Sequence, residues 1–353
     1  MAGGTMRRAI VLAYHFPPVG GAGVQRNAKF VRYLREFGYE PVVVTGPGAG
    51  SDRWAPTDDT LAADISGGVE VHRIPGPEPG PSSRLHGRAE RWFGVRSPWL
   101  TWLLRGMVDV GVRVGAGADV VYASLVPYET APAAEAVARR LGIPWVADLQ
   151  DPWALDEMMV YPSRHHRRLA TGAMRRALRA ADAVVMNTPE ARERVVRRFP
   201  ELARKPVVSI TNGYDALDFS APIAKREDDR FRIVHTGYLH TQLGLDHRRT
   251  RMARRLLGGS MSGVDILTRS HVYLLEAVEQ LRREEPELGN RIEIQLAGVL
   301  TPADRTVGGR STAVRMLGYV PHDEAVALMR SADLLFLPMQ NLADGAHVGI
   351  VPG

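Results

Sequence analysis

The chain has the sequence pattern of a two-domain α/β protein built on parallel sheets. Short apolar runs of strand length alternate with segments of helical periodicity over residues 1–215, as in sheets whose parallel strands are joined by helices. The alternation restarts at residue 231, and 353 residues exceed what one ordinary core accommodates. We therefore expect domains over 1–215 and 231–353, joined by the polar linker 216–230.

In the first domain the strand candidates are short apolar runs, and the helix candidates repeat apolar side chains every three or four positions. We expect strands over 9–13, 41–45, 69–74, 120–123, 145–149, 183–186 and 207–210. We expect helices over 24–37, 132–141, 165–180 and 189–198. The Pro- and Gly-rich stretches 46–56 and 75–83 are expected to be loops.

The second domain repeats this logic. Strands are expected from 231, over 292–297, 314–317 and 334–337, and helices over 271–283 and 323–331. The Arg- and Gly-rich insert 242–268 has no clear pattern. We leave its structure open and allow for mobility.

Glycines gather where the first strand meets the first helix. The amides of Gly20, Gly21 and Gly23 can approach an anion closely, and a helix N-terminus behind them carries partial positive charge. Arg26 would add a fixed charge. We expect a binding site for phosphate or for a negatively charged part of a substrate. The alternative is that the glycines only allow the chain to turn. Dinucleotide binding is disfavoured, because Arg26 replaces the third fingerprint glycine and no acidic residue follows the strand 41–45.

Two carboxylates, Asp148 and Asp151, follow the strand predicted over 145–149. A carboxylate there could orient an acceptor hydroxyl, accept its proton or hold sugar hydroxyls. Trp153 could form a stacking wall. The alternative is structural: Asp148 would cap a turn, and Asp151 would be the N-cap of a helix beginning at Pro152.

Composition excludes several classes of function. Hydrophobic residues make up 45% and charged residues 24% of the chain, as in soluble globular proteins. The absence of cysteine excludes disulfides and thiolate metal sites, and we find no signal segment or membrane-spanning apolar run. The net charge of +6 attracts nucleic acid, anionic lipid and phosphorylated substrates alike. Since no nucleic-acid motif accompanies the arginines, we expect no binding of nucleic acid. The absence of cysteine is compatible with a reducing compartment, and we expect a cytoplasmic protein.

The ordered set of motifs resembles a family-4 retaining glycosyltransferase of the GT-B type, over nearly the whole chain. The motifs lie at 16–26, 147–153, 181–188, 211–215 and 317–338. The resemblance implies two facing Rossmann-like domains, with the acceptor on the first and a nucleotide-sugar on the second. It implies transfer to a lipid-linked or cell-envelope glycan, with no metal and no cofactor beyond the nucleotide-sugar co-substrate.

The resemblance also implies roles for individual residues. Asp151, ahead of Asp148, is the catalytic candidate. The substrate-binding candidates are Gly20, Gly21, Gly23, Arg26, Trp153 and Asn212. The donor-binding candidates are Thr236 and Gly237, with Arg248, Arg249 or Arg269 supplying the basic group that the family places near the diphosphate.

One departure from the family concerns the end of the sequence. The chain stops at Gly353, before the helix whose paired glutamates bind the donor in the family. We therefore expect an incomplete second domain and little transferase activity. The alternatives are an inactive fragment, a non-catalytic binding or scaffold protein and, more weakly, a sugar-nucleotide epimerase.

The segment 88–105 mixes arginine with aromatic and apolar residues. Its members are Arg88, Arg91, Trp92, Phe93, Arg96, Trp99, Trp102, Leu103, Leu104 and Arg105. Such a mixture could place rings at headgroup depth and arginines on lipid phosphates, giving a peripheral contact with the inner membrane leaflet. The alternative is a helix that packs its Trp residues into the first domain or lines the acceptor site.

Overall fold

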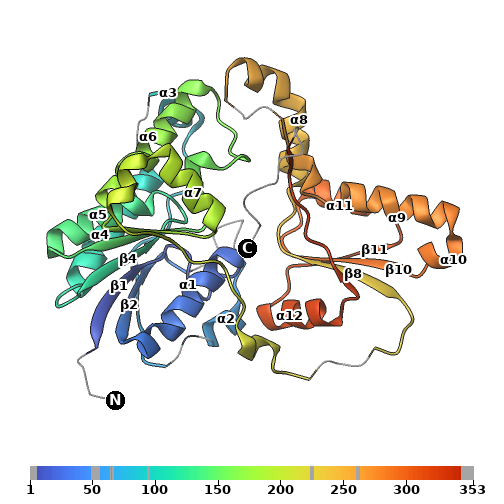
Figure 1. The fold of residues 1–353 in the computed structure, drawn as a ribbon, viewed down its shortest axis with the longest axis horizontal. Coiled ribbons are helices and arrows are strands. Elements are labelled where there is room, and N and C mark those ends of the chain that lie inside the picture. Colours follow the sequence, from blue (N-terminus) through green and yellow to red (C-terminus); the bar gives the residue numbers. More distant parts are fainter. Residues whose placement is uncertain are drawn as a thin grey trace. The chain divides into compact units, whose positions relative to one another are not determined.

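A computed structural model describes residues 6–48, 56–63, 65, 67–93, 96–222, 226–259 and 263–342 of the chain. Its contacts divide the chain into two compact units. Unit 1 contains Met1–Trp153 and Gly172–Asn212, and unit 2 contains Ala154–Thr171 and Gly213–Gly353. Both units alternate strands with helices, so the predicted α/β fold with parallel sheets is confirmed (Figure 1).

The units differ from the predicted continuous domains in the placement of residues 154–171. This segment precedes the last strands of unit 1 in sequence but packs within unit 2. The cause is backbone pairing: the Tyr161 N–H donates to the Gly259 carbonyl and the Arg164 N–H to the Leu257 carbonyl, each at 2.8 Å. Such long-range pairing leaves no periodic signal in the sequence.

Unit 1 is built on a seven-stranded parallel sheet with the order β3-β2-β1-β4-β5-β6-β7. The strands are β1 (Arg7–Leu12), β2 (Tyr39–Thr45), β3 (Glu70–Arg73), β4 (Val120–Ser124), β5 (Trp145–Leu149), β6 (Ala183–Met186) and β7 (Val207–Ser209). Ile10, Leu12 and Val43 are fully buried, because parallel strands are covered on both faces. This is why these strands were recognisable as apolar runs.

The helices of unit 1 follow its strands in the chain (Figure 1). They are α1 (Ala22–Tyr33), α2 (Asp59–Ala63), α3 (Arg84–Phe93), α4 (Pro98–Val114), α5 (Thr130–Leu141), α6 (Arg164–Ala180) and α7 (Pro189–Arg198), of which α6 enters unit 1 at Gly172 and has residues 164–171 in unit 2. The 3₁₀ helices η1 (Leu34–Phe37), η2 (Trp153–Leu155) and η3 (Pro200–Arg204) add short turns. Helix α4 begins at Ser97, whose hydroxyl accepts from the Leu100 N–H at 2.9 Å, with Pro98 at the first helical position.

Unit 2 has a smaller parallel sheet with the order β11-β10-β8-β12. Its strands are β8 (Phe231–Thr236), β10 (Ile292–Ala297), β11 (Val314–Gly318) and β12 (Leu334–Leu335), and β9 (Val264–Asp265) pairs separately with β13 (Asn341–Leu342). Its helices are α8 (Thr241–Leu256), α9 (Val272–Glu284), α10 (Pro286–Gly289), α11 (Pro302–Gly308) and α12 (His322–Ser331), with the 3₁₀ helices η4 (Ala216–Phe219) and η5 (Ile266–Thr268).

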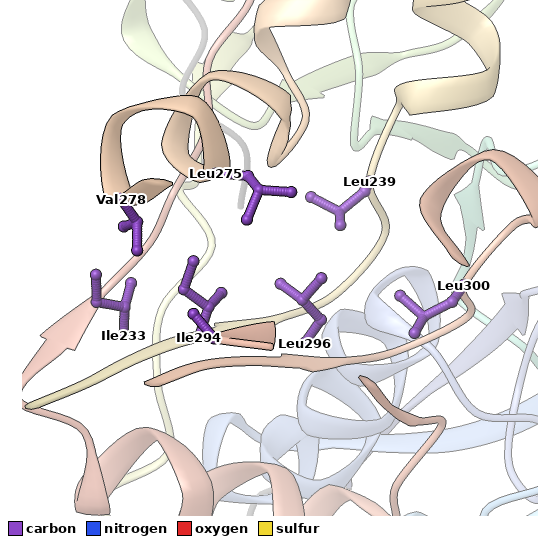
Figure 2. Packing of buried hydrophobic residues seen from close by; sticks show 8 residues of the cluster. Ile233, Leu239, Leu275, Val278, Ile294, Leu296 and Leu300 are labelled. Carbon is purple, nitrogen blue, oxygen red and sulfur yellow. The ribbon is translucent and has the colours of Figure 1, made fainter. Parts of the chain in front are cut away.

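The core of unit 2 lies between its sheet and α9. Figure 2 shows Leu275 and Val278 of α9 facing Ile233, Ile294 and Leu296 of the sheet. Burial of each such side chain stabilises the unit by roughly 1.5–3 kcal/mol relative to exposure. The packing fixes the carboxyl ends of β8 and β10, where the donor-side candidates lie.

The structure of the insert 242–268 was left open from its sequence, and most of it is helical. Residues 241–256 form α8, which begins with the buried Thr241 and presents exposed Leu243 and Leu245. The helix lacks one clean apolar stripe, so its periodicity was not evident. Among the described helices none is long and apolar enough to cross a membrane.

Candidate functional site

The glycine loop joins β1 to α1 at the carboxyl edge of the unit 1 sheet. Gly21 is the N-cap of α1 with φ 102°, and no side chain caps this helix end. A Cβ built on Gly21 would meet no heavy atom within 4 Å, and one on Gly23 would lie 3.6 Å from Gln150 Oε1. The loop therefore leaves open space at Gly21, beside the amino end of a twelve-residue helix.

The expectation for Gly20 is corrected by the structure. Its N–H donates to the Pro56 carbonyl at 2.7 Å, and the residue is buried. Next to it, Val19 forms a β-bridge with Thr57. The Gly20 amide thus anchors the loop to the chain ahead of α2, and only the later glycines remain candidates for an anion.

Arg26 forms a buried ion pair with Asp148. Its Nε lies 2.8 Å from Asp148 Oδ2 and its Nη2 lies 3.0 Å from Asp148 Oδ1, while the two side chains are 4% and 0% exposed. Burial alone would lower the pKa of Arg26, but the hydrogen bonds and charge of Asp148 outweigh it and raise the pKa. The bidentate geometry is the strong form of a guanidinium–carboxylate contact.

Two further side chains complete the network around this pair. The Tyr122 hydroxyl donates to Asp148 Oδ2, and Arg26 Nη1 donates to Asn212 Oδ1 at 3.1 Å. Burial, together with the Asp148 charge, raises the pKa of Tyr122 well above its ordinary value, so the hydroxyl keeps its proton. The Arg26 guanidinium also lies 4.6 Å from the centre of the Phe30 ring. The network ties α1 to β4, β5 and the end of unit 1.

These contacts revise two predicted roles. Asp148 was expected to face a substrate, but both its oxygens are bound and it is fully buried. Arg26 was expected to add positive charge to the glycine loop, but its charge is compensated at 2.8 Å. Both residues therefore act in positioning α1, and Asn212 lies within their reach.

Asp151 lies at the turn after β5 and is exposed. The preceding residue, Gln150, donates to the Gly23 carbonyl at 3.0 Å and to Ser124 Oγ at 3.3 Å. This contact brings the end of β5 to the glycine loop, and the exposed Asp151 is the next residue along the chain.

Trp153 has φ 48° and stacks on Tyr128, with ring centres 4.6 Å apart and an interplanar angle of 2°. Tyr128 thus covers one face of the Trp153 ring that was predicted to stack on a substrate. Sequence reasoning missed Tyr122, Tyr128 and Gln150, because nothing in their neighbours distinguishes them from ordinary sheet and loop residues.

In unit 2 the donor-side candidates Thr236 and Gly237 end β8. Gly237 has φ 145°, and its N–H donates to the Ala297 carbonyl at 2.8 Å. Gly298, with φ 137°, approaches so closely that a Cβ on it would lie 1.9 Å from the Gly237 carbonyl oxygen. Glycine is therefore required at this crossing of two strand ends.

The candidate arginines of unit 2 occupy different environments. Arg248 pairs with Asp265 at 2.5 Å and donates to the Tyr273 hydroxyl, contacts that raise its pKa. Arg269 is half-buried, and its carbonyl accepts from the His240 N–H at 3.0 Å, which places its backbone beside the segment after β8. Burial and, to a smaller extent, the Arg269 charge lower the pKa values of His235 and His240. Arg269 is consequently the better placed of the two for a ligand at Gly237.

Several buried histidines surround the same strand ends. The His235 Nδ1–H donates to the Phe336 carbonyl, 2.9 Å away, while its Nε2 is buried without a partner in the described part of the chain. Burial lowers the pKa of His235 and of His271, and lowers that of His240 to about 3. The histidines are hence neutral near pH 7. Within the described residues, no group of three side chains of the His, Asp and Glu type is placed to hold a metal ion.

The segment 88–105 is engaged within unit 1. Trp99 Nε1 donates to Glu78 Oε1 at 2.7 Å, and Trp102 Nε1 donates to the Pro75 carbonyl at 3.0 Å. Leu103 is fully buried. The side chains of residues 91–95 lie outside the described part. Since the polar ends of both Trp residues have partners, membrane contact through this segment stays a prediction.

Known proteins resemble this chain in fold and, over its first part, in sequence. Sucrose-phosphate synthase from Thermosynechococcus elongatus has a TM-score of 0.55 at 11% identity, covering 93% of this chain and 74% of that one. HepE from Anabaena, in complex with UDP and glucose, has a TM-score of 0.51 at 14% identity, covering 93% and 73%. MnaA from S. aureus with UDP has a TM-score of 0.51 at 10% identity, covering 94% and 73%.

At such low identities these likenesses show the fold, which is of the GT-B type. No curated protein sequence matches the chain. A family model described as "Glycosyl transferase 4-like domain" matches residues 20–213, a range that contains the glycine loop, Asp151 and Asn212. Because this range is more than half of the sequence, the chain belongs to the glycosyl transferase 4-like domain family.

Proposed function

We propose that the protein is a retaining glycosyltransferase that moves a hexosyl group from a nucleotide-sugar to a hydroxyl of a lipid-linked or cell-envelope glycan, at the cytoplasmic face of the membrane. The observation that carries the proposal is the family match over residues 20–213. The GT-B fold supports it, since solved structures of that fold are described as holding UDP or UDP-glucose.

The donor is proposed to lie on unit 2. Transfer leaves a nucleoside diphosphate, whose developing negative charge needs a nearby positive group or backbone amides. Arg269 supports this role through its position beside His235 and His240, and Gly237 offers backbone without a side chain. Arg248, whose guanidinium pairs with Asp265, is the alternative candidate.

The acceptor is proposed to lie on unit 1, with Asp151 as the catalytic carboxylate. An exposed carboxylate beside the glycine loop can orient an acceptor hydroxyl and accept its proton. Gly21, Gly23 and Trp153 would contact the substrate. Asp148 acts through Arg26 as a positioning residue rather than on the substrate.

Calorimetry with UDP and UDP-glucose tests the donor side. We expect Arg269→Gln to weaken binding at least about tenfold, as expected for the loss of a charged hydrogen bond, and Arg248→Gln to leave it unchanged. Equal losses in the two variants would refute the assignment of Arg269. The absence of binding to any nucleotide-sugar in a panel would refute the donor proposal.

Turnover tests the acceptor side. In a form of the protein that shows transfer, Asp151→Asn should lower turnover at least about a hundredfold, the low end for an acid-base or positioning group, and leave UDP binding and thermal stability unchanged. Asp109→Asn, on the exposed face of α4, is the matched control. A fully active but less stable Asp151→Asn protein would support the N-cap role instead. Nucleotide-sugar binding without transfer would favour a non-catalytic binding protein, and an altered sugar without acceptor product would indicate an epimerase.

A further inference from the structure

The amino end of α6 and the carboxyl end of α8 lie side by side in unit 2, although they are far apart in sequence. The two backbone hydrogen bonds from Tyr161 and Arg164 to residues 259 and 257 join them. A Cβ on Gly258 would lie 3.1 Å from the Arg164 side chain, so the segments are in close contact. The exposed side chains of 164, 165, 168 and 169 and of 249, 251, 252 and 255–257 form what we call the α6–α8 surface.

This surface exposes large apolar side chains. Met252 is 78% exposed, Leu256 86% and Leu257 58%, and Leu169 of α6 is 54% exposed. Met252 and Leu256 are four residues apart and hence on one face of α8. Single exposed apolar residues are common, but Met252, Leu256 and Leu257 lie together at the carboxyl end of α8, and such a group indicates an interaction site.

The same surface is strongly basic. Segment 241–259 contains five arginines and one acidic residue, and 161–171 contains three arginines and no acidic residue. Arg249, Arg251 and Arg255 are exposed, and in the described part of the chain no carboxylate forms an ion pair with them. Arg248 differs, since Asp265 is its partner. The positive charge is therefore available to an external anion.

We propose that the α6–α8 surface docks on an anionic lipid bilayer, with Met252, Leu256 and Leu257 below the headgroups and the arginines on lipid phosphates. Exposed apolar side chains flanked by arginines bind membranes in this way, with the apolar groups in the interface and the guanidinium groups at the headgroups. Charge complementarity selects an anionic surface.

A nucleic acid is the less suitable partner. Single-strand binding relies on aromatic stacking platforms, whereas 249–257 contains no aromatic residue. Exposed leucine and methionine side chains gain nothing from a phosphate backbone. Docking extends the proposed function by bringing the protein to a lipid-linked acceptor. The docking proposal itself depends on the α6–α8 surface and does not require transferase activity.

Co-sedimentation of the full chain with vesicles tests the proposal. Vesicles of phosphatidylcholine with about 30% phosphatidylglycerol should bind the protein, and pure phosphatidylcholine should not. The triple variant Arg249→Gln, Arg251→Gln, Arg255→Gln should lose about a hundredfold in affinity, or about fivefold for each arginine at the surface. The variant Met252→Ser, Leu256→Ser, Leu257→Ser should lose at least about tenfold.

The matched control removes three exposed arginines elsewhere, Arg139→Gln, Arg140→Gln and Arg310→Gln, and should change binding less than about twofold. Circular dichroism and thermal melting check that each variant is folded. Failure to bind anionic vesicles, or an equal loss in the control, would overturn the proposal. So would unchanged vesicle binding by the apolar variant, or a single-stranded oligonucleotide that displaces the vesicles and binds the apolar variant normally. No sugar donor is present, so failure would leave the transferase proposal standing.

Discussion

Removing one member of the Arg26–Asp148 pair should destabilise unit 1 strongly. In Asp148→Asn the guanidinium stays buried, at 4% exposure, with its compensating charge gone. Breaking a buried ion pair by removing one partner costs about 3–5 kcal/mol. Such a loss is a large fraction of the roughly 5–15 kcal/mol that stabilises a typical protein.

Urea unfolding followed by circular dichroism measures the loss. The midpoint should fall clearly in Asp148→Asn, whereas the double variant Arg26→Met, Asp148→Leu should recover part of it, because no buried charge then remains. Glu201→Gln, which breaks the exposed pair with Arg175, is the control and should leave the midpoint unchanged. If Asp148→Asn unfolds at the same urea concentration as the parent protein, or if the double variant is as unstable as the sum of the singles, the pair does not anchor α1 as argued.

Three further outcomes are expected. Gly21→Val should abolish substrate binding and cost only about 1–3 kcal/mol in stability, because φ is 102° but no atom lies within 4 Å of the new Cβ. Calorimetry measures the binding and urea unfolding the stability, and unchanged binding would contradict the prediction. Gly298→Ala should destabilise unit 2 by more than about 3 kcal/mol, since its Cβ would overlap the Gly237 carbonyl, whereas Gly80→Ala, with no neighbour within 4 Å, should be tolerated in the same unfolding assay. Finally, burial depresses the folded-state pKa of His240 to about 3, below its unfolded value near 6.5. The unfolded chain therefore takes up the proton first, and the free energy of unfolding falls as pH drops below 6.5, by about 1 kcal/mol per pH unit. In His240→Asn the urea midpoint measured between about pH 7 and 4 should fall less steeply with decreasing pH, and the same dependence on pH in both proteins would exclude this contribution.

The fold was largely predictable because its parallel strands are buried on both faces. The strands at 145–149, 183–186 and 292–297 have the predicted bounds, since a continuous apolar run marks a strand covered by helices. Helix α8 was not predicted because its large apolar side chains are exposed rather than aligned on one buried face. Amphipathic periodicity detects burial, and it gives no signal where an apolar surface faces outward.

The position of the candidate site could be predicted from the sequence, but its ion pair and hydrogen bonds could not. Glycines after a first strand and carboxylates after a central strand indicate the carboxyl edge of a sheet, where Gly21 and Asp151 lie. The pairing of Arg26 with Asp148 joins residues 122 positions apart, and no local pattern indicates it. A basic side chain beside a glycine loop resembles an anion ligand until its partner is known.

The compensated charge of Arg26 has a consequence for ionic strength. With a carboxylate at 2.8 Å, the guanidinium presents a dipole rather than a net charge to anything bound at Gly21 and Gly23. An anion there would be held mainly by direct hydrogen bonds from backbone amides, over distances much shorter than the Debye length of about 10 Å. Its affinity should hence vary weakly with added salt, by less than about twofold over the range in which the Debye length falls from about 10 Å to 8 Å. The fraction of loops that hold an anion would therefore stay nearly constant over this range of ionic strength.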